Sequence, residues 1–398
     1  MTTMAVGTRR RTTVKTSDVV LAITFIGVFR PYLLPDNLVA AMRIAFLGLS
    51  LIFLVSHMKL KRLVNASLFF SGAVLLSCVK NYVTHKLSMQ NLLNGILYAI
   101  CLYCLYTIIQ YFVQKGRGRD LVSNLYHIVL VYVIISIPFI IFLPPRGAIY
   151  PFGSKYFTSY YMMALGAIYM LRHRRSLAAE RRHRRLFLLV AAILFVLIWY
   201  INCRTAAVAF AAMIAMNYLP DGLKRKMMNH WVMLALTLGS AAILLGLSAI
   251  LEISAVQFVI TRILGKDLTL TDRVRYYSRF TSVLTSGDMW FGYGYASSEL
   301  RNAIGLGSNI QNGLLQHTLS YGAIGALAFV MTVFLSGRPN VNRQTDCWAL
   351  YTLVYGMTIA AVVEISFNTV YFLGLFLVMW SYHGTDGIES NYAARELT

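Results

Sequence analysis

Twelve apolar runs, separated by short and often basic segments, constrain this chain more than any other feature of its sequence. A run of about 20 apolar residues is long enough to cross the hydrocarbon core of a bilayer as a helix. Helices pair all their backbone polar groups internally, which lipid requires. The sequence therefore predicts an all-α, polytopic transmembrane helical bundle with about twelve membrane-spanning helices. The runs lie at 19–34, 38–56, 64–80, 91–113, 122–143, 157–171, 186–202, 205–219, 230–251, 309–336, 347–365 and 368–383.

One polar interruption, at 252–308, is far longer than the others. Connections between helices need only a few residues, so a polar segment of this length is expected to carry function. We therefore predict three parts. Residues 1–251 form about nine transmembrane helices, 252–308 form a large extracytoplasmic loop that carries part of the active site, and 309–398 form about three further transmembrane helices.

The composition agrees with this class. The chain is 58% hydrophobic and only 13% charged, whereas soluble domains carry about 25% charged residues. Its formal net charge of +21 could suit a nucleic-acid-binding protein, but the basic residues lie mainly in short segments between apolar runs. We therefore expect membrane lipids, and no nucleic acid, among its partners.

The basic residues also predict the orientation, because Lys and Arg accumulate on cytoplasmic loops. With the N-terminus inside, the inner segments hold 23 Lys and Arg and the outer loops hold ten. We predict a multi-pass protein of the cytoplasmic (inner) membrane, with both termini cytoplasmic and an extracytoplasmic active site. No cleavable signal peptide is expected, because no small-residue cleavage site follows the basic N-terminus. The seven arginines at 172–185 suit a topology anchor, and anionic-lipid binding is the alternative.

The sequence gives no sign of a metal or cofactor site. The five cysteines lie within or beside apolar runs, so paired disulfides on the outer face are not predicted. No Asp-x-Asp pattern occurs in 252–308. We therefore expect a reaction that uses neither a metal ion nor a cofactor.

Four motifs occur in a consistent order along the chain. Asn202-Cys203-Arg204-Thr205-Ala206 lies at the outer end of a helical hairpin, Arg273 lies in the long polar segment, and Gly292-Tyr293-Gly294 follows an aromatic residue. Asn312 then precedes Gly322-Ala323-Ile324-Gly325 by ten residues. Over roughly 130 of the 398 residues, these motifs resemble the O-antigen polymerase and ligase superfamily (Wzy/WaaL-like membrane glycosyltransferases).

The resemblance implies a function. It implies a polymerase that joins polyprenyl (undecaprenyl) diphosphate-linked oligosaccharide repeat units into a surface polysaccharide of O-antigen, lipopolysaccharide or capsule type. Both donor and acceptor would be lipid-linked, and the glycosyl transfer would be inverting and metal-independent. A chain-length regulator and a flippase would be its protein partners.

Two alternatives remain at this point. A ligase would transfer the finished glycan to lipid A core or another acceptor, and the family usually has His where this chain has Gln311. Because we expect the ligase branch to depend more on that His, Gln311 favours the polymerase. A lipid-linked oligosaccharide flippase would instead place polar residues at every depth of a central cavity, whereas here they concentrate on one side.

Arginines within membrane spans usually face a cavity or a partner. Arg30, Arg43 and Arg204 are all predicted at one depth, near the outer ends of helices. Guanidinium groups suit bidentate contacts to phosphate oxygens, so this layer could hold a diphosphate. The alternative is that these side chains extend to the outer lipid head groups. This alternative is weaker for Arg204, because the resemblance implies that Arg204 and Arg273 are functional arginines.

The remaining candidates lie near the outer face. Arg275, Tyr277 and Arg279 suit a saccharide groove, or alternatively a solvated amphipathic helix at 272–284. Gln311 and Asn312 are expected to orient the acceptor hydroxyl, since a neutral amide does not accept a proton near pH 7. His317 suits a core histidine better than a catalytic or substrate-binding one. Glu364 is either a base or, by preference, a counter-ion to one of the arginines.

Overall fold

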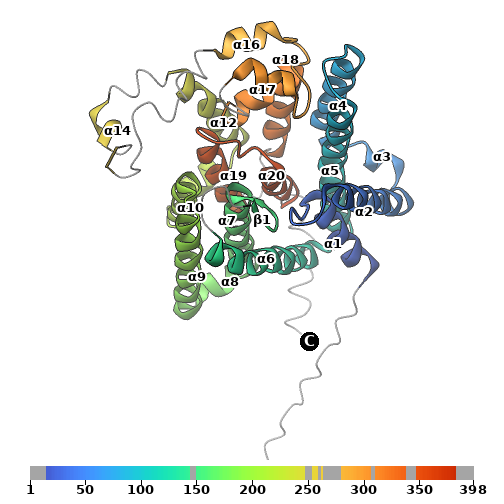
Figure 1. The fold of residues 1–398 in the computed structure, drawn as a ribbon. Coiled ribbons are helices and arrows are strands. Elements are labelled where there is room, and N and C mark those ends of the chain that lie inside the picture. Colours follow the sequence, from blue (N-terminus) through green and yellow to red (C-terminus); the bar gives the residue numbers. More distant parts are fainter. Residues whose placement is uncertain are drawn as a thin grey trace, which may run out of the picture.

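The computed structural model describes residues 15–143, 149–246, 253–258, 261–262, 279–305, 310–337 and 347–381. Most of these residues are helical, and the helices pack as a bundle (Figure 1). Each of the twelve apolar runs coincides with one helix, so the predicted all-α class is confirmed for the described part of the chain. These helices are α1 (Thr16–Val28), α2 (Asp36–His57), α4 (Ser67–Val83), α5 (Met89–Gln114), α6 (Gly118–Phe142), α7 (Lys155–Arg172), α9 (Arg181–Tyr200), α10 (Arg204–Met216), α12 (His230–Leu245), α18 (Gly313–Ser336), α19 (Trp348–Ala361) and α20 (Thr369–Ser381).

Short elements connect these helices. A small antiparallel hairpin precedes α7, with Tyr150 paired to Gly153. The described residues of the predicted loop carry only short helices, and its position outside the membrane stays a prediction. The short elements are α3 (Leu60–Leu63), β1 (Ile149–Tyr150), β2 (Gly153–Ser154), α8 (Arg174–Ala179), α11 (Asp221–Met227), α14 (Ser254–Phe258), α16 (Phe280–Ser286) and α17 (Ser298–Ile304).

Several helices suit a membrane by length and composition. Among the described residues, α2, α5, α6, α9 and α18 are long and apolar enough to cross one. In the most apolar stretch of α9 only 22% of the residues are buried within the protein, so large apolar side chains such as Val196 face outward. A water-soluble protein rarely exposes such faces, whereas lipid accepts them. The chain is thus a helical protein suited to a membrane.

The remaining helices are shorter or less apolar. A 13-residue helix such as α1 extends about 20 Å, less than the roughly 30 Å of the hydrocarbon core. α7 is instead buried along its length, from Thr158 to Met170. A helix that is covered on all sides lies inside a bundle rather than against lipid. The prediction of twelve separate crossings therefore stays a prediction.

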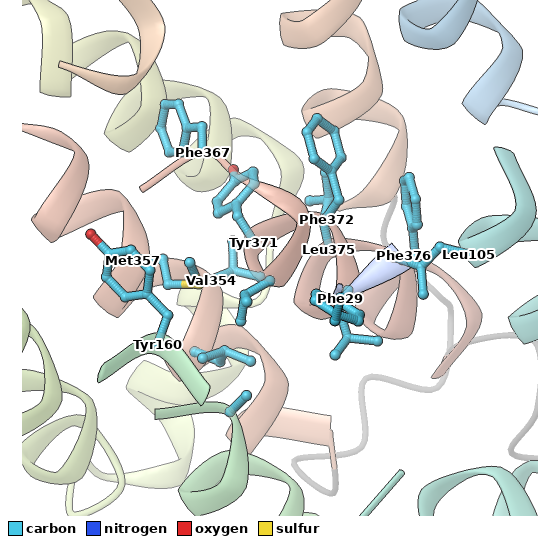
Figure 2. Packing of buried hydrophobic residues seen from close by; sticks show 14 of the residues in the cluster. Phe29, Leu105, Tyr160, Val354, Met357, Phe367, Tyr371, Phe372, Leu375 and Phe376 are labelled. Atoms are coloured by element: carbon cyan, nitrogen blue, oxygen red, sulfur yellow. The ribbon is translucent and has the colours of Figure 1, made fainter. Parts of the chain in front are cut away.

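The core forms around α20, whose residues from Val370 to Val378 are almost all buried. Figure 2 shows side chains of α20, such as Tyr371 and Phe376, among residues from α5, α7 and α19 and near Phe29, which follows α1. Phe376 packs edge-on against Tyr106 of α5, with ring centroids 5.2 Å apart. α19 and α20 thus lie in the core of the bundle, in contact with helices of the N-terminal half.

The helix predicted at 309–336 differs from the structure in two ways. It begins only at Gly313, so Gln311 precedes the helix instead of lying on its first turn. It is also broken at Gly322, whose φ of 68° and ψ of −168° are not helical. Glycine adopts such a conformation without steric cost. A break of this kind removes intrahelical partners from nearby backbone groups, which must then be paired in another way.

Candidate functional site

The backbone of residues 289–294 fills the break in α18. This segment belongs to the polar stretch that was predicted to form an outer loop, and it approaches the helix so closely that four backbone hydrogen bonds join them. The loop thus supplies the partners that the broken helix lacks. The four bonds run from Tyr293 N to Leu319 O (3.0 Å), Gly294 N to Ser320 O (2.7 Å), Ala323 N to Met289 O (2.8 Å) and Ile324 N to Trp290 O (3.2 Å).

Two glycines make this approach possible. A Cβ on Gly292, whose φ is 64°, would lie 2.4 Å from the carbonyl oxygen of Leu319. A Cβ on Gly322 would lie 2.3 Å from the carbonyl group of Trp290. Both distances are far below van der Waals contact, so neither position accepts a side chain in this arrangement. The Gly-Tyr-Gly and Gly-x-x-Gly motifs, separate in the sequence, therefore meet backbone to backbone.

Helix α4 holds the same loop from its other side. The Lys80 ammonium forms an ion pair with Asp288, at the start of the loop. The Ser77 hydroxyl donates to the carbonyl of Phe291, and the Asn81 amide donates to the carbonyl of Gly292 at 3.1 Å. The loop is therefore fixed between α4 and α18, which pack against each other although they are far apart in the sequence.

Asp288 also orders the turn that begins the loop. Its Oδ1 accepts hydrogen bonds from the backbone N–H groups of Trp290 and Phe291, both at 3.0 Å. The hydrogen bond from Lys80 is the largest influence on this carboxyl and holds its pKa below the ordinary value, and the two backbone N–H groups act in the same direction. Asp288 is thus charged at neutral pH, as its contacts require.

The fixed loop continues directly into Tyr295, which lies beside Arg30 and Arg43. The Tyr295 hydroxyl is within electrostatic range of both guanidinium groups. Its ring packs on that of Tyr98 in α5, with centroids 5.2 Å apart. The structure therefore brings two of the predicted arginines together with Tyr295 of the predicted loop and with Tyr98 of α5.

Both arginines are half-buried and held in place. Arg43 donates from Nε to the carbonyl oxygen of Gly27 (3.1 Å) and from Nη2 to the Cys101 thiol (3.2 Å). The guanidinium carbon of Arg30 lies 4.5 Å from the centroid of the Tyr32 ring. We name Arg30, Arg43, Tyr98 and Tyr295 the arginine–tyrosine cluster.

This cluster carries positive charge that has no close carboxylate partner among the described residues. Among the described residues, neither arginine forms an ion pair with a carboxylate. Asp36 lies within electrostatic range of Arg30, but its side chain is exposed. Half-buried cations of this kind are unfavourable unless an anion or water compensates them. The cluster is therefore suited to bind an anion.

Arg204 and Glu364 lie in a second polar group. Arg204 is half-buried in the first turn of α10, at the end of the α9–α10 hairpin where it was predicted. Glu364 lies in the turn between α19 and α20 rather than on a helix, and is 9% exposed. Its carboxyl is within electrostatic range of Tyr160 and of Cys203, the residue before Arg204.

The β-hairpin and the start of α7 connect the two groups. Tyr32, which contacts Arg30, donates its backbone N–H to the carbonyl of Pro151 at 2.7 Å. Lys155, the first residue of α7, donates to the carbonyl of Asn202 in the α9–α10 turn at 3.2 Å. Both polar groups therefore lie around the same end of α7.

Asn312 has a structural position. Its side chain is fully buried and caps α18 by accepting the N–H of Leu315 at 2.9 Å. Its amide donates to the carbonyls of Ser240 in α12 (3.1 Å) and Ala361 in α19 (2.8 Å). These contacts join the start of α18 to α12 and to the end of α19, so we treat Asn312 as a positioning residue. Gln311 is half-buried with a φ of 53°, and its predicted contact with an acceptor stays a prediction.

His317 lies among aromatic rings in the first half of α18. Its Nε2–H donates to the carbonyl oxygen of Phe367 at 3.0 Å. The rings of Phe70 and Phe329 have centroids 5.2 and 4.9 Å from the imidazole. These are the contacts of a satisfied core histidine, the reading that the sequence favoured.

Three predicted loop residues, Arg273, Arg275 and Tyr277, lie outside the described residues. Arg279 is exposed at the N-cap of α16, and its guanidinium approaches Gly305 of the loop after α17. No group of three or more His, Cys, Asp and Glu within the described ranges could hold a metal ion.

Neither a protein-family model nor a curated protein sequence matches this chain. The resemblance to the polymerase and ligase superfamily is thus carried only by the motifs in the sequence.

Proposed function

We propose that this protein is a membrane glycosyltransferase that joins polyprenyl diphosphate-linked oligosaccharides at the outer face of the cytoplasmic membrane. The observation that carries this proposal is the pair of half-buried guanidinium groups of Arg30 and Arg43, with no ion-pair partner among the described residues. A diphosphate supplies the missing negative charge and matches the hydrogen-bond pattern of guanidinium groups. Its polyprenyl tail would remain in lipid.

The proposed reaction is a displacement at the anomeric carbon of the donor sugar. An acceptor hydroxyl oxygen forms the new bond to this carbon, and the bond to the diphosphate oxygen breaks with its electron pair on the diphosphate. The arginines neutralise the charge that develops on this leaving group. The hydroxyl proton leaves to a base, and Glu364, a buried carboxylate of the second polar group, is the candidate acceptor.

Within this class we favour a polymerase over a ligase. The motif position that usually holds His in the family holds Gln311 here, and an amide positions a hydroxyl without removing its proton. In the proposed orientation both termini are cytoplasmic, and the arginine–tyrosine cluster faces the outer side. The chain would then act on units that a flippase delivers, with a regulator of chain length beside it.

The proposal is tested by the glycans on polyprenyl carriers in a strain that lacks this protein. Accumulation of single repeat units, reversed when the gene is restored, is the expected result for a polymerase. Accumulation of long chains that remain on the carrier would instead identify a ligase. An unchanged distribution of lipid-linked glycans would contradict both.

A further inference from the structure

We propose that the Tyr295 hydroxyl is the third group of the anion site and donates a hydrogen bond to the diphosphate of the substrate. This inference rests on the proposed function for its substrate class. Tyr295 lies within electrostatic range of Arg30 and Arg43, and its side chain is only partly buried. Within the described part of the chain, no hydrogen bond from its hydroxyl is present. A phenolic O–H beside two cations is therefore available to donate to a phosphate oxygen.

The neighbouring tyrosine of the loop is used differently. Tyr293 is buried, and its hydroxyl donates to the carbonyl of Val283 at 2.8 Å and lies 2.9 Å from the Ser286 hydroxyl. Its hydroxyl is thus committed to the structure of the loop. The Tyr293 hydroxyl is therefore structural, whereas the Tyr295 hydroxyl lies beside the two arginines.

The loop that is bound in the break of α18 positions Tyr295 beside the two arginines. Backbone hydrogen bonds fix Tyr293 and Gly294 to Leu319 and Ser320, immediately before Tyr295. Tyr98 supports the ring from α5. The position of the hydroxyl is therefore set before any ligand binds, which reduces the entropy lost on binding.

The ligand is expected to be a lipid diphosphate. Two cations and one hydroxyl from separate elements match the higher charge and the wider spread of oxygen atoms of a diphosphate better than those of a monophosphate. Next to Arg43, Ile44 on α2 is 60% exposed and belongs to an outward apolar face. A prenyl tail lying along this face would be continuous with a head group at Arg43.

The test measures binding to the full chain in lipid nanodiscs with geranylgeranyl diphosphate, geranylgeranyl monophosphate and inorganic pyrophosphate as probes. Tyr295→Phe keeps the ring on Tyr98 and removes only the hydroxyl, so its affinity for the lipid diphosphate should fall about ten- to a hundredfold. Affinity for the monophosphate should change much less. Tyr218→Phe, the control at a tyrosine that is 59% exposed just beyond the end of α10, should alter lipid diphosphate affinity by less than about threefold.

A double-mutant cycle tests whether Tyr295 and Arg30 bind the same diphosphate. If Tyr295 and Arg30 act on the same diphosphate, Arg30→Gln should weaken binding less in the Tyr295→Phe protein than in the wild type. Equal lipid diphosphate affinity in the wild type and Tyr295→Phe, with unchanged melting temperatures, would overturn the inference. A Tyr295-dependent site that binds pyrophosphate as well as the lipid would support the inference and contradict the proposed lipid substrate. A wild type that binds none of the probes would overturn both.

Discussion

At the scale of single residues, the proposed anion site depends on two arginines whose charge has no counter-ion among the described residues. Arg30 and Arg43 come from different helices, and each is held by contacts that leave donors available. Holding such groups half-buried is unfavourable by itself. The arrangement is understandable if it serves an anionic ligand, as active sites commonly sacrifice stability for function.

Replacing Arg30 or Arg43 with Lys should therefore reduce polymer formation by about tenfold or more, because the ammonium keeps the charge and loses the planar fork. Polymer length and amount in a complemented deletion strain would measure this. Arg62→Lys is the matched control, since Arg62 is exposed and its guanidinium group donates to Gln114, away from the cluster. Normal polymer in both cluster variants would reduce these arginines to anchors at the membrane surface.

Asn312 and Gln311 should behave differently although they are adjacent. Asn312→Ala removes a helix cap and leaves buried carbonyls of α12 and α19 without donors, so unfolding should become easier by about 1–3 kcal/mol. Gln311→Ala should instead lower activity by about ten- to a hundredfold with little change in stability. Thermal unfolding of the purified variants, together with their activities, separates the two effects. Equal stability losses would contradict the division of roles.

At the scale of elements, the break in α18 and the loop that fills it form one unit. The loop carries its own anchor, because Asp288 is paired with Lys80 and caps two backbone N–H groups. A loop with so many fixed backbone groups is expected to hold its place without a ligand. The unit thus explains why two glycine motifs 30 residues apart are needed together.

Gly292→Ala should therefore disrupt the loop and abolish activity, because its Cβ would collide with the carbonyl of Leu319 and its φ is positive. Gly72→Ala is the matched control. Gly72 lies in α4 with nothing within 4 Å of an added Cβ, so this variant should keep activity and match or exceed wild-type stability. Limited proteolysis between α16 and α18 would report the disruption, and a protected loop in Gly292→Ala would contradict the proposed packing.

The ion pair between Lys80 and Asp288 should also make the stability of the loop depend on pH. The pKa of Asp288 is lowered in the folded protein, so its stabilising effect is fully present above the ordinary carboxyl pKa and is lost as the pH falls through the lower folded value. Protection of the Trp290 and Phe291 amides from hydrogen exchange should begin to decline below about pH 4. Asp288→Asn keeps an acceptor and loses the charge, so it should weaken protection at pH 7 and remove this acid dependence.

At the scale of the whole molecule, the sequence was sufficient for the helices but not for the site. Apolar runs predict helices because lipid and protein interiors both require paired backbones, and each run coincides with one. Arg30 and Arg43 also lie where they were predicted along the chain, Arg30 just after α1 and Arg43 in the first half of α2, and their depth in a membrane stays a prediction. The insertion of 289–294 into α18 could not be predicted, since backbone hydrogen bonds between distant segments leave no periodic pattern. Tyr98, and the place of Tyr295 beside the two arginines, could not be predicted for the same reason.

The proposed orientation is tested with reporters. A reporter fused after Arg185 should be cytoplasmic, because the arginines before it favour that side. One inserted near Ser286 should be extracytoplasmic. Two reporters on the same side would contradict the orientation and would place the arginine–tyrosine cluster at the wrong face.

Reconstitution of the purified chain tests the proposed polymerase activity in the absence of any other protein. The full chain in nanodiscs would be supplied with polyprenyl diphosphate-linked repeat units and no other protein, and the lipid-linked glycans would be measured by mass spectrometry. A polymerase should produce chains of two or more units together with free polyprenyl diphosphate. Both products should be lost in the protein that carries Arg30→Lys and Arg43→Lys. Single units that persist unchanged beside a folded wild-type protein that binds them would contradict the proposed activity.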